Sequence, residues 1–180
     1  MGTKCKFNNG KQIFSGEAQM ISAGGNITSN QQVANTTGET AVLTDTVYAN
    51  TLNSTSMSFR VFIAGEISSS GSGDCTLTLR YGTTDILALV TAALANEDDK
   101  PFKAEWTGHI LTTGSSGKVV AHACGTFFQG TPLYFATDTA NTGATVDLTA
   151  DGSLNVTAHW DNASADDDII VTHGWIEYYN

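Results

Sequence analysis

The fold class is decided by the stretch Met57-Ser58-Phe59-Arg60-Val61-Phe62-Ile63-Ala64-Gly65-Glu66-Ile67. Its odd positions are apolar, apart from Gly65, while Ser58, Arg60 and Glu66 stand between them. An alternation with a period of two is typical of a β-strand that buries one face, and no α-helix keeps it. We therefore predict a half-buried strand here.

The same alternation returns elsewhere in the chain. It is clearest in Cys75–Tyr81 and Leu154–Trp160, where threonines stand at the polar positions and β-branching favours the pleat. About nine strands are expected in all, because turn residues such as Gly, Ser, Asn and Asp separate the apolar segments at regular intervals. The other six are Ala41–Tyr48, Asp85–Val90, Phe102–Thr112, Lys118–Phe128, Ala144–Leu148 and Asp168–Tyr179.

Only Thr91–Asp99, with its alanines, has the composition of a helix, and it is too short to organise a domain. Strands at this spacing without long helical crossovers predict an all-β, antiparallel β-sandwich. This excludes parallel α/β folds and their nucleotide sites. Residues 32–180 are expected to form the sandwich, and residues 1–31 a short N-terminal arm.

Composition limits the partners. The 180 residues carry a net charge of −10, which opposes binding to nucleic acid and to anionic membranes. No apolar run is long enough for a membrane span, and the first residues have no secretory signal. We therefore expect a protein that is made and kept in a cytosol.

The N-terminal segment has the opposite charge to the rest. It holds three lysines and one acid before Asn30, so it carries about +2 while the remainder carries about −12. Isolated apolar residues among Gly, Asn and Gln suit an arm that packs on another surface, although an edge strand of the sandwich is equally open. The residues expected at the contact are Lys4, Lys6, Phe7, Lys11, Ile13 and Phe14.

No catalytic constellation is found. His122 and Cys124 lie two apart on one predicted strand and would face the same side, which is a weak signal for a metal or a thiolate nucleophile. The three cysteines are widely spaced and predict neither disulfides nor a zinc site. Without a nucleophile–base pair, we expect no enzyme, no catalytic or metal-ligating residues and no cofactor.

Two acidic loops have a similarly plain interpretation. Asp161–Asp168 offers oxygen ligands of the kind that Ca²⁺ prefers, but it lacks the central glycine and the terminal glutamate of an EF-hand loop. Glu97–Asp99 is a run of acidic residues of the kind found at solvent-exposed loop tips. Both are expected to be solvated.

Several segments along the chain each consist mostly of a turn joined to a strand, and together they span roughly residues 32 to 177. They are Asn35–Thr40, Tyr48–Leu52, Phe59–Gly65, Thr76–Gly82, Phe102–Trp106, Thr112–Ala121, Leu154–Trp160 and Asn162–Ala165. Taken in this order, they resemble a domain that recurs in virion structural proteins of tailed bacteriophages.

The resemblance implies a jelly-roll-like β-sandwich of the type found in capsid decoration, head-fibre and tail-tip proteins, which are generally not enzymes. Residues 1–31 show neither the heptads nor the Gly-x-y period of a fibre shaft. We therefore expect a capsid decoration or cement protein on the virion surface, assembled in the host cytoplasm. Its expected partner is the major capsid protein or another virion protein, and its expected state is a homotrimer.

The alternative is a receptor-binding or carbohydrate-binding adhesin, since exposed aromatic rings can stack on sugars. Trp106 and Trp160 are expected to be buried because they follow apolar parity, whereas Tyr178 and Tyr179 are expected to be freer. The full set of aromatic candidates is Tyr48, Tyr81, Trp106, Tyr134, Trp160, Trp175, Tyr178 and Tyr179.

Overall fold

The computed structural model of the chain describes residues 6–8, 11–13, 20–24, 27, 29–71, 73–91, 96–127, 133–137 and 142–180. Fourteen β-strands and no helix lie in these residues. The described residues accordingly contain no helical membrane span.

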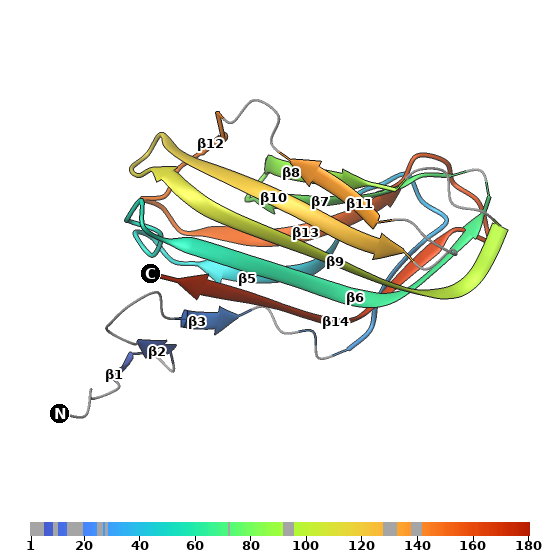
Figure 1. The fold of residues 1–180 in the computed structure, drawn as a ribbon, viewed down its shortest axis with the longest axis horizontal. Helices are drawn as coiled ribbons and strands as arrows, with labels where there is room; N and C mark the ends of the chain where they lie inside the picture. Colours follow the sequence, from blue (N-terminus) through green and yellow to red (C-terminus); the bar gives the residue numbers. More distant parts are fainter. Residues whose placement is uncertain are drawn as a thin grey trace.

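Twelve of the strands form two packed sheets, visible as two layers in Figure 1, and every pairing is antiparallel. The large sheet has the order β11 (Leu133–Thr137), β10 (Gly117–Phe127), β9 (Asn96–Thr112), β6 (Ser58–Ser70), β14 (Asp168–Tyr179), β3 (Met20–Gly24). In addition, β12 (Ala144–Val146) pairs with β10, and β4 (Gln31–Ala34) pairs with β14. The small sheet has the order β5 (Thr40–Val47), β13 (Gly152–Trp160), β7 (Cys75–Tyr81), β8 (Thr84–Val90).

The topology is that of a jelly roll. Four antiparallel pairs are nested along the chain, β4 with β14, β5 with β13, β6 with β9, and β7 with β8, and they alternate between the two sheets. Strands β10 to β12 are an addition beside β9. The predicted all-β, jelly-roll-like antiparallel sandwich is confirmed.

The core lies between the sheets. On β6 the predicted inward residues Phe59, Val61 and Ile63 are buried, as expected from the alternation. Trp106 from the large sheet and Trp160 from the small one are fully buried, which confirms the burial expected for both. All nine predicted strands are present, and the structure adds short strands that the sequence did not indicate.

The predicted helix over Thr91–Asp99 is wrong where the structure describes it. β9 already begins at Asn96, because Asn96 and Glu97 pair with Ser70 and Ser69 of β6. Residues 92–95 lie outside the described residues. At Asn96 and Glu97, pairing with a neighbouring strand therefore sets the local structure.

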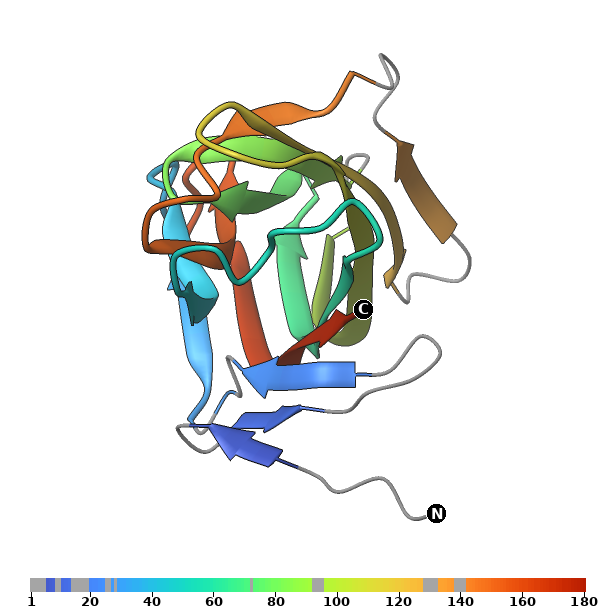
Figure 2. The same cartoon turned by 90° about the vertical axis from the view of Figure 1, so that its left-hand side faces the viewer.

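The N-terminal segment contributes to the sheet edge. β3 pairs with β14 from Gly24 opposite Ile176 to Met20 opposite Tyr179, so it is an edge strand of the large sheet. β1 (Lys6–Asn8) and β2 (Lys11–Ile13) form a separate two-stranded sheet. Figure 2 shows this hairpin outside the two layers, beyond β3.

Candidate functional site

The predicted attachment residues fall on the outlying hairpin. Its register sets Lys6 opposite Ile13, and Phe7 opposite Gln12, with Lys11 one residue further along β2. Lys4 and Phe14 lie outside the described residues. The hairpin thus brings four of the six predicted residues into one small element, and their role in attachment stays a prediction.

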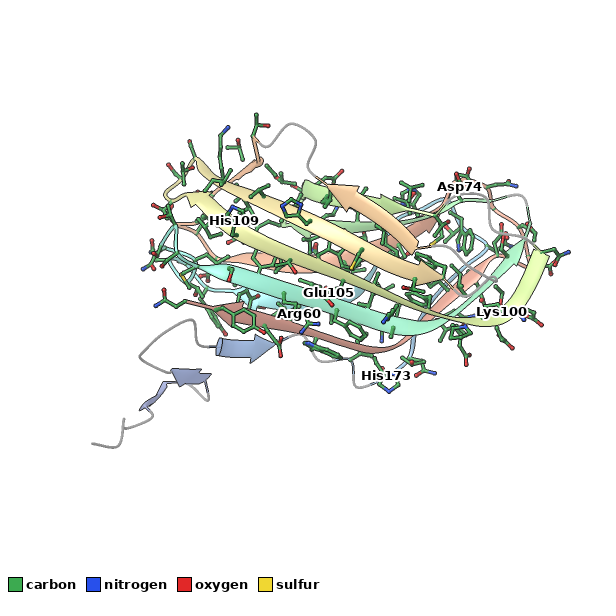
Figure 3. All side chains as sticks on the ribbon, in the orientation of Figure 1. Arg60, Asp74, Lys100, Glu105, His109 and His173 are labelled. Carbon is green, nitrogen blue, oxygen red and sulfur yellow. The ribbon has the colours of Figure 1, made fainter. Side chains whose placement is uncertain are left out.

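This element stands at one end of the molecule. Figure 1 shows β1 and β2 on the side where β14 ends, while Figure 3 shows Asp74 and Lys100 at the opposite end. The hairpin of β1 and β2 therefore lies at the opposite end of the long axis from Asp74 and Lys100.

The outer face of the large sheet carries a charged pair. Arg60 donates from Nε and Nη2 to the two carboxylate oxygens of Glu105, both at 2.8 Å. Hydrogen bonding to Glu105 raises the pKa of the Arg60 guanidinium, and the two side chains lie side by side in Figure 3. Both are partly exposed, so the pair orders this face more than it stabilises the fold.

Two aromatic rings lie next to this pair. Phe62 of β6 and Trp175 of β14 are stacked, with ring centroids 4.1 Å apart and 25° between their planes. Both are half-buried. We call the five residues Arg60, Phe62, Glu105, Trp175 and Tyr179 the β6–β14 face.

The aromatic candidates do not assemble into a broad stacking platform in the described residues. Tyr81, Trp106, Trp160 and Tyr178 are buried, whereas Tyr48 is 57% exposed. Trp175 and Tyr179 are half-buried, and the side chain of Tyr134 is outside the description.

The expectation that Tyr178 would be free is wrong. Its hydroxyl donates to Asp45 Oδ2 at 2.9 Å, joining the large sheet to the small one, and burial raises the pKa of Tyr178. The alternation along β14 turns Tyr178 inward although it is close to the C-terminus.

The small sheet has its own charged cluster on its outer side. Arg80 contacts Glu39 at 2.6 Å and Asp85 at 2.5 Å, and Thr157 donates to Glu39 at 3.2 Å. Because these groups satisfy one another, we interpret the cluster as structural.

The structure adds no support for a metal site or a thiolate nucleophile at His122 and Cys124. His122 is exposed and Cys124 half-buried on β10. In the part of the chain that the structure describes, no three His, Cys, Asp or Glu side chains gather as a metal site. Cys75 is buried, and burial, with a smaller contribution from Asp167, raises the pKa of its thiol, so it stays protonated.

Aspartates gather at the end of the sandwich where β6 ends and β14 begins. A polar cavity of about 330 Å³ is lined there by Ser68, Ser69, Asn96, Asp98, Asp99, Ala165, Asp166 and Asp168. Next to these residues in the chain, Asp167 is fully buried. The predicted solvated loop over Asp161–Asp168 is therefore wrong at Asp167, whose alternation with Ile169 turns it inward.

No family model matches the sequence, and no curated protein matches it. Among solved structures, the chain is similar to the CBM2 module of the evolved Dit protein of Lactobacillus casei BL23 phage J-1. The two share 14% sequence identity with a TM-score of 0.34, over 99% of this chain and 80% of that one. At this TM-score the likeness carries no argument about function.

Proposed function

We propose that this chain is a non-enzymatic virion structural protein of a tailed bacteriophage, and that it decorates the outer surface of the capsid. Its partner in this proposal is the major capsid protein or another virion protein. The sequence resemblance over residues 32 to 177 supports the phage assignment, and the arrangement of the N-terminal segment supports attachment.

One observation carries the attachment proposal. Two strands of the positively charged N-terminal segment, β1 and β2, form a two-stranded sheet of their own, separate from the two sheets of the sandwich. The remaining residues carry about −12. A small element of opposite charge that projects from a packed body is suited to contact a second protein.

The chemistry of the segment indicates how it would bind. Lys4, Lys6 and Lys11 would meet acidic groups on the capsid, which favours encounter and sets the register. Phe7, Ile13 and Phe14 would fill apolar pockets and exclude water around those charges, as anchor residues do in other interfaces. The apolar contacts would then supply most of the affinity.

Counting copies tests this function directly. Mass spectrometry of purified particles should find this protein at hundreds of copies per head, in fixed ratio to the major capsid protein. A number in single digits to tens would contradict decoration and favour a tail component. Absence from purified particles would overturn the virion assignment itself.

The β6–β14 face supports a second candidate, a carbohydrate-binding adhesin. It combines an aromatic pair with the Arg60–Glu105 hydrogen bonds, and sugar sites commonly pair an aromatic surface with fixed polar groups. Phe62 and Trp175 turn ring faces toward each other, so a sugar would have only the outer part of the stack. A glycan array should then give signals that W175A loses and Y48F keeps. An array without signal contradicts this candidate.

A further inference from the structure

The fully buried carboxylate of Asp167 is only half satisfied. Its Oδ1 accepts a hydrogen bond from the backbone amide of Ser70 at 2.6 Å, but its Oδ2 has no hydrogen-bond partner. A buried polar oxygen without a partner costs about 1–3 kcal/mol, and more when it is charged. This oxygen therefore calls for a counterpart that is positively charged or donates a proton.

A second carboxylate oxygen, from Asp161, approaches the same glycine as Asp167 Oδ2. A methyl group built on Gly73 would be 3.0 Å from Asp167 Oδ2 and 3.4 Å from Asp161 Oδ1. The two oxygens thus approach the same point of the backbone, from the two ends of the β13–β14 loop. Gly73 itself lies in the β6–β7 loop, so two loops meet here.

The position of Asp161 is fixed by the same loop. Its Oδ1 accepts from the backbone amide of Asp74 at 2.8 Å, and its own amide donates to the carbonyl of Asp74 at 3.1 Å. Asp161 therefore holds its carboxylate toward Gly73 without needing Asp167.

A proton shared between the two carboxyl groups would leave one negative charge at this point. A divalent cation would balance both negative charges and relieve the repulsion between the two carboxylates. Hard divalent cations prefer carboxylate and carbonyl oxygens, and Ca²⁺ accepts irregular geometry.

We propose that Asp161 and Asp167 hold a calcium-type cation that fastens the β6–β7 loop to the β13–β14 loop. Two side-chain ligands agree with the finding that the described residues contain no group of three. Backbone carbonyls and water would complete the shell. So few charged ligands correspond to a dissociation constant on the order of 10⁻⁴–10⁻³ M, the range of weak extracellular modules.

The site can be read out through Trp160, whose Cε3 lies 3.4 Å from the same Gly73 methyl position. Tb³⁺ substitutes for Ca²⁺, and a nearby indole sensitises its luminescence. The wild-type chain should therefore give Tb³⁺ emission on tryptophan excitation, which Ca²⁺ displaces. Thermal melting in Ca²⁺ and in EDTA gives a second, label-free readout.

The test variant is D161N, with D166N as its matched control. Both residues are exposed and both changes remove one negative charge, and the amide oxygen of D161N keeps the bond from the Asp74 amide. G73A adds a methyl at the meeting point of the two oxygens without changing charge. D167N is avoided as the main test because its residue is buried.

We expect Ca²⁺ to raise the melting temperature of the wild type and of D166N. In D161N and G73A the half-saturating concentrations of Ca²⁺ and Tb³⁺ should rise at least tenfold. Equal binding by D161N and D166N would overturn the site in favour of diffuse attraction to the acidic end. Absence of any Tb³⁺ or Ca²⁺ response in the wild type would overturn it altogether.

Discussion

At the scale of single residues, the two faces of β6 differ most in what they tolerate. Val61 is fully buried between the sheets, whereas its neighbour Arg60 is partly exposed and paired with Glu105. At Val61, the effect of a substitution on stability therefore depends on burial away from water. At the neighbouring Arg60, it depends on a surface ion pair.

The variant V61D should lose cooperative folding. It buries an unpaired carboxylate at a cost of several kcal/mol, comparable to the whole stability of a marginal domain. The variant R60A should lose no more than about 1 kcal/mol, because exposed ion pairs contribute little. Thermal melting followed by circular dichroism checks both. Equal melting temperatures would mean that the strand register is wrong.

Tyr178 predicts a dependence on alkaline pH. Burial raises its pKa, so the folded protein keeps a proton that the unfolded chain loses above about pH 10. The folded state then binds more protons than the unfolded state, and the free energy of unfolding falls as pH rises. Y178F removes this contribution, so its unfolding free energy should fall less steeply above about pH 10.

At neutral pH the same variant loses the hydrogen bond to Asp45, which should cost about 1–2 kcal/mol. Urea unfolding at neutral and alkaline pH measures both effects. Parallel pH profiles for the wild type and Y178F would contradict the buried, protonated hydroxyl.

Residue-level prediction from the sequence succeeded where alternation alone decides burial, as at Val61, Trp106 and Trp160. It failed at Tyr178 and Asp167. Tyr178 lies near the chain end and Asp167 is acidic, and both features suggested exposure. Yet Tyr178 is one of the inward-facing residues of β14, and Asp167, directly before β14, is also buried. Burial at these positions depends on the residues of other strands and loops that pack against them, and the sequence of one strand does not show which residues those are.

At the scale of elements, the close contact between β6 and β14 depends on Gly65. A methyl there would be 1.8 Å from the carbonyl oxygen of Ile170. This oxygen belongs to the backbone, so it cannot turn aside as a flexible side chain can. The pairing of these strands shifts register between Val171 and His173, so the approach occurs next to a bulge.

The variant G65A should therefore force β6 and β14 apart and destabilise the sandwich by several kcal/mol. G38A is the matched control, since its methyl would meet only the Thr36 hydroxyl, at 3.3 Å. Chemical denaturation compares the two. A loss of stability in G65A no larger than in G38A would contradict the close approach.

Strand ends were predictable where turn residues mark them and not where tertiary pairing extends the strand. Asp168–Tyr179 was predicted with the bounds that β14 has, because a polar loop precedes it. β9 instead runs back to Asn96 along β6, across the acidic stretch Glu97–Asp99. An edge strand in the N-terminal segment, where β3 lies, was one of two open alternatives, and β4 was not predicted. Both strands are stabilised by pairing with β14 and not by their own pattern.

At the scale of the whole molecule, the oligomer is a separate prediction. A decoration protein at a symmetry axis is expected to be a homotrimer. Light scattering coupled to size-exclusion chromatography should give three times the chain mass of 18.9 kDa at micromolar concentration. A monomer at every concentration would contradict the trimer and leave the attachment proposal standing.

The charge asymmetry was visible in the sequence, whereas the place of the segment was not. Composition located the positive charge in the first thirty residues. Only the structure shows that part of this segment, β3, is an edge strand of the large sheet, while β1 and β2 form a sheet of their own.

The central claim is that the N-terminal segment attaches the protein to the capsid, and deletion of residues 1–14 tests it most directly. The deletion removes β1 and β2 but leaves β3 paired with β14, so cooperative melting should persist. Binding to undecorated heads should be lost, and K6E/K11E should weaken it more than K103E/K118E, which changes the charge of the body equally. If the truncated protein stays folded and binds undecorated heads as tightly as the full chain, the claim is contradicted.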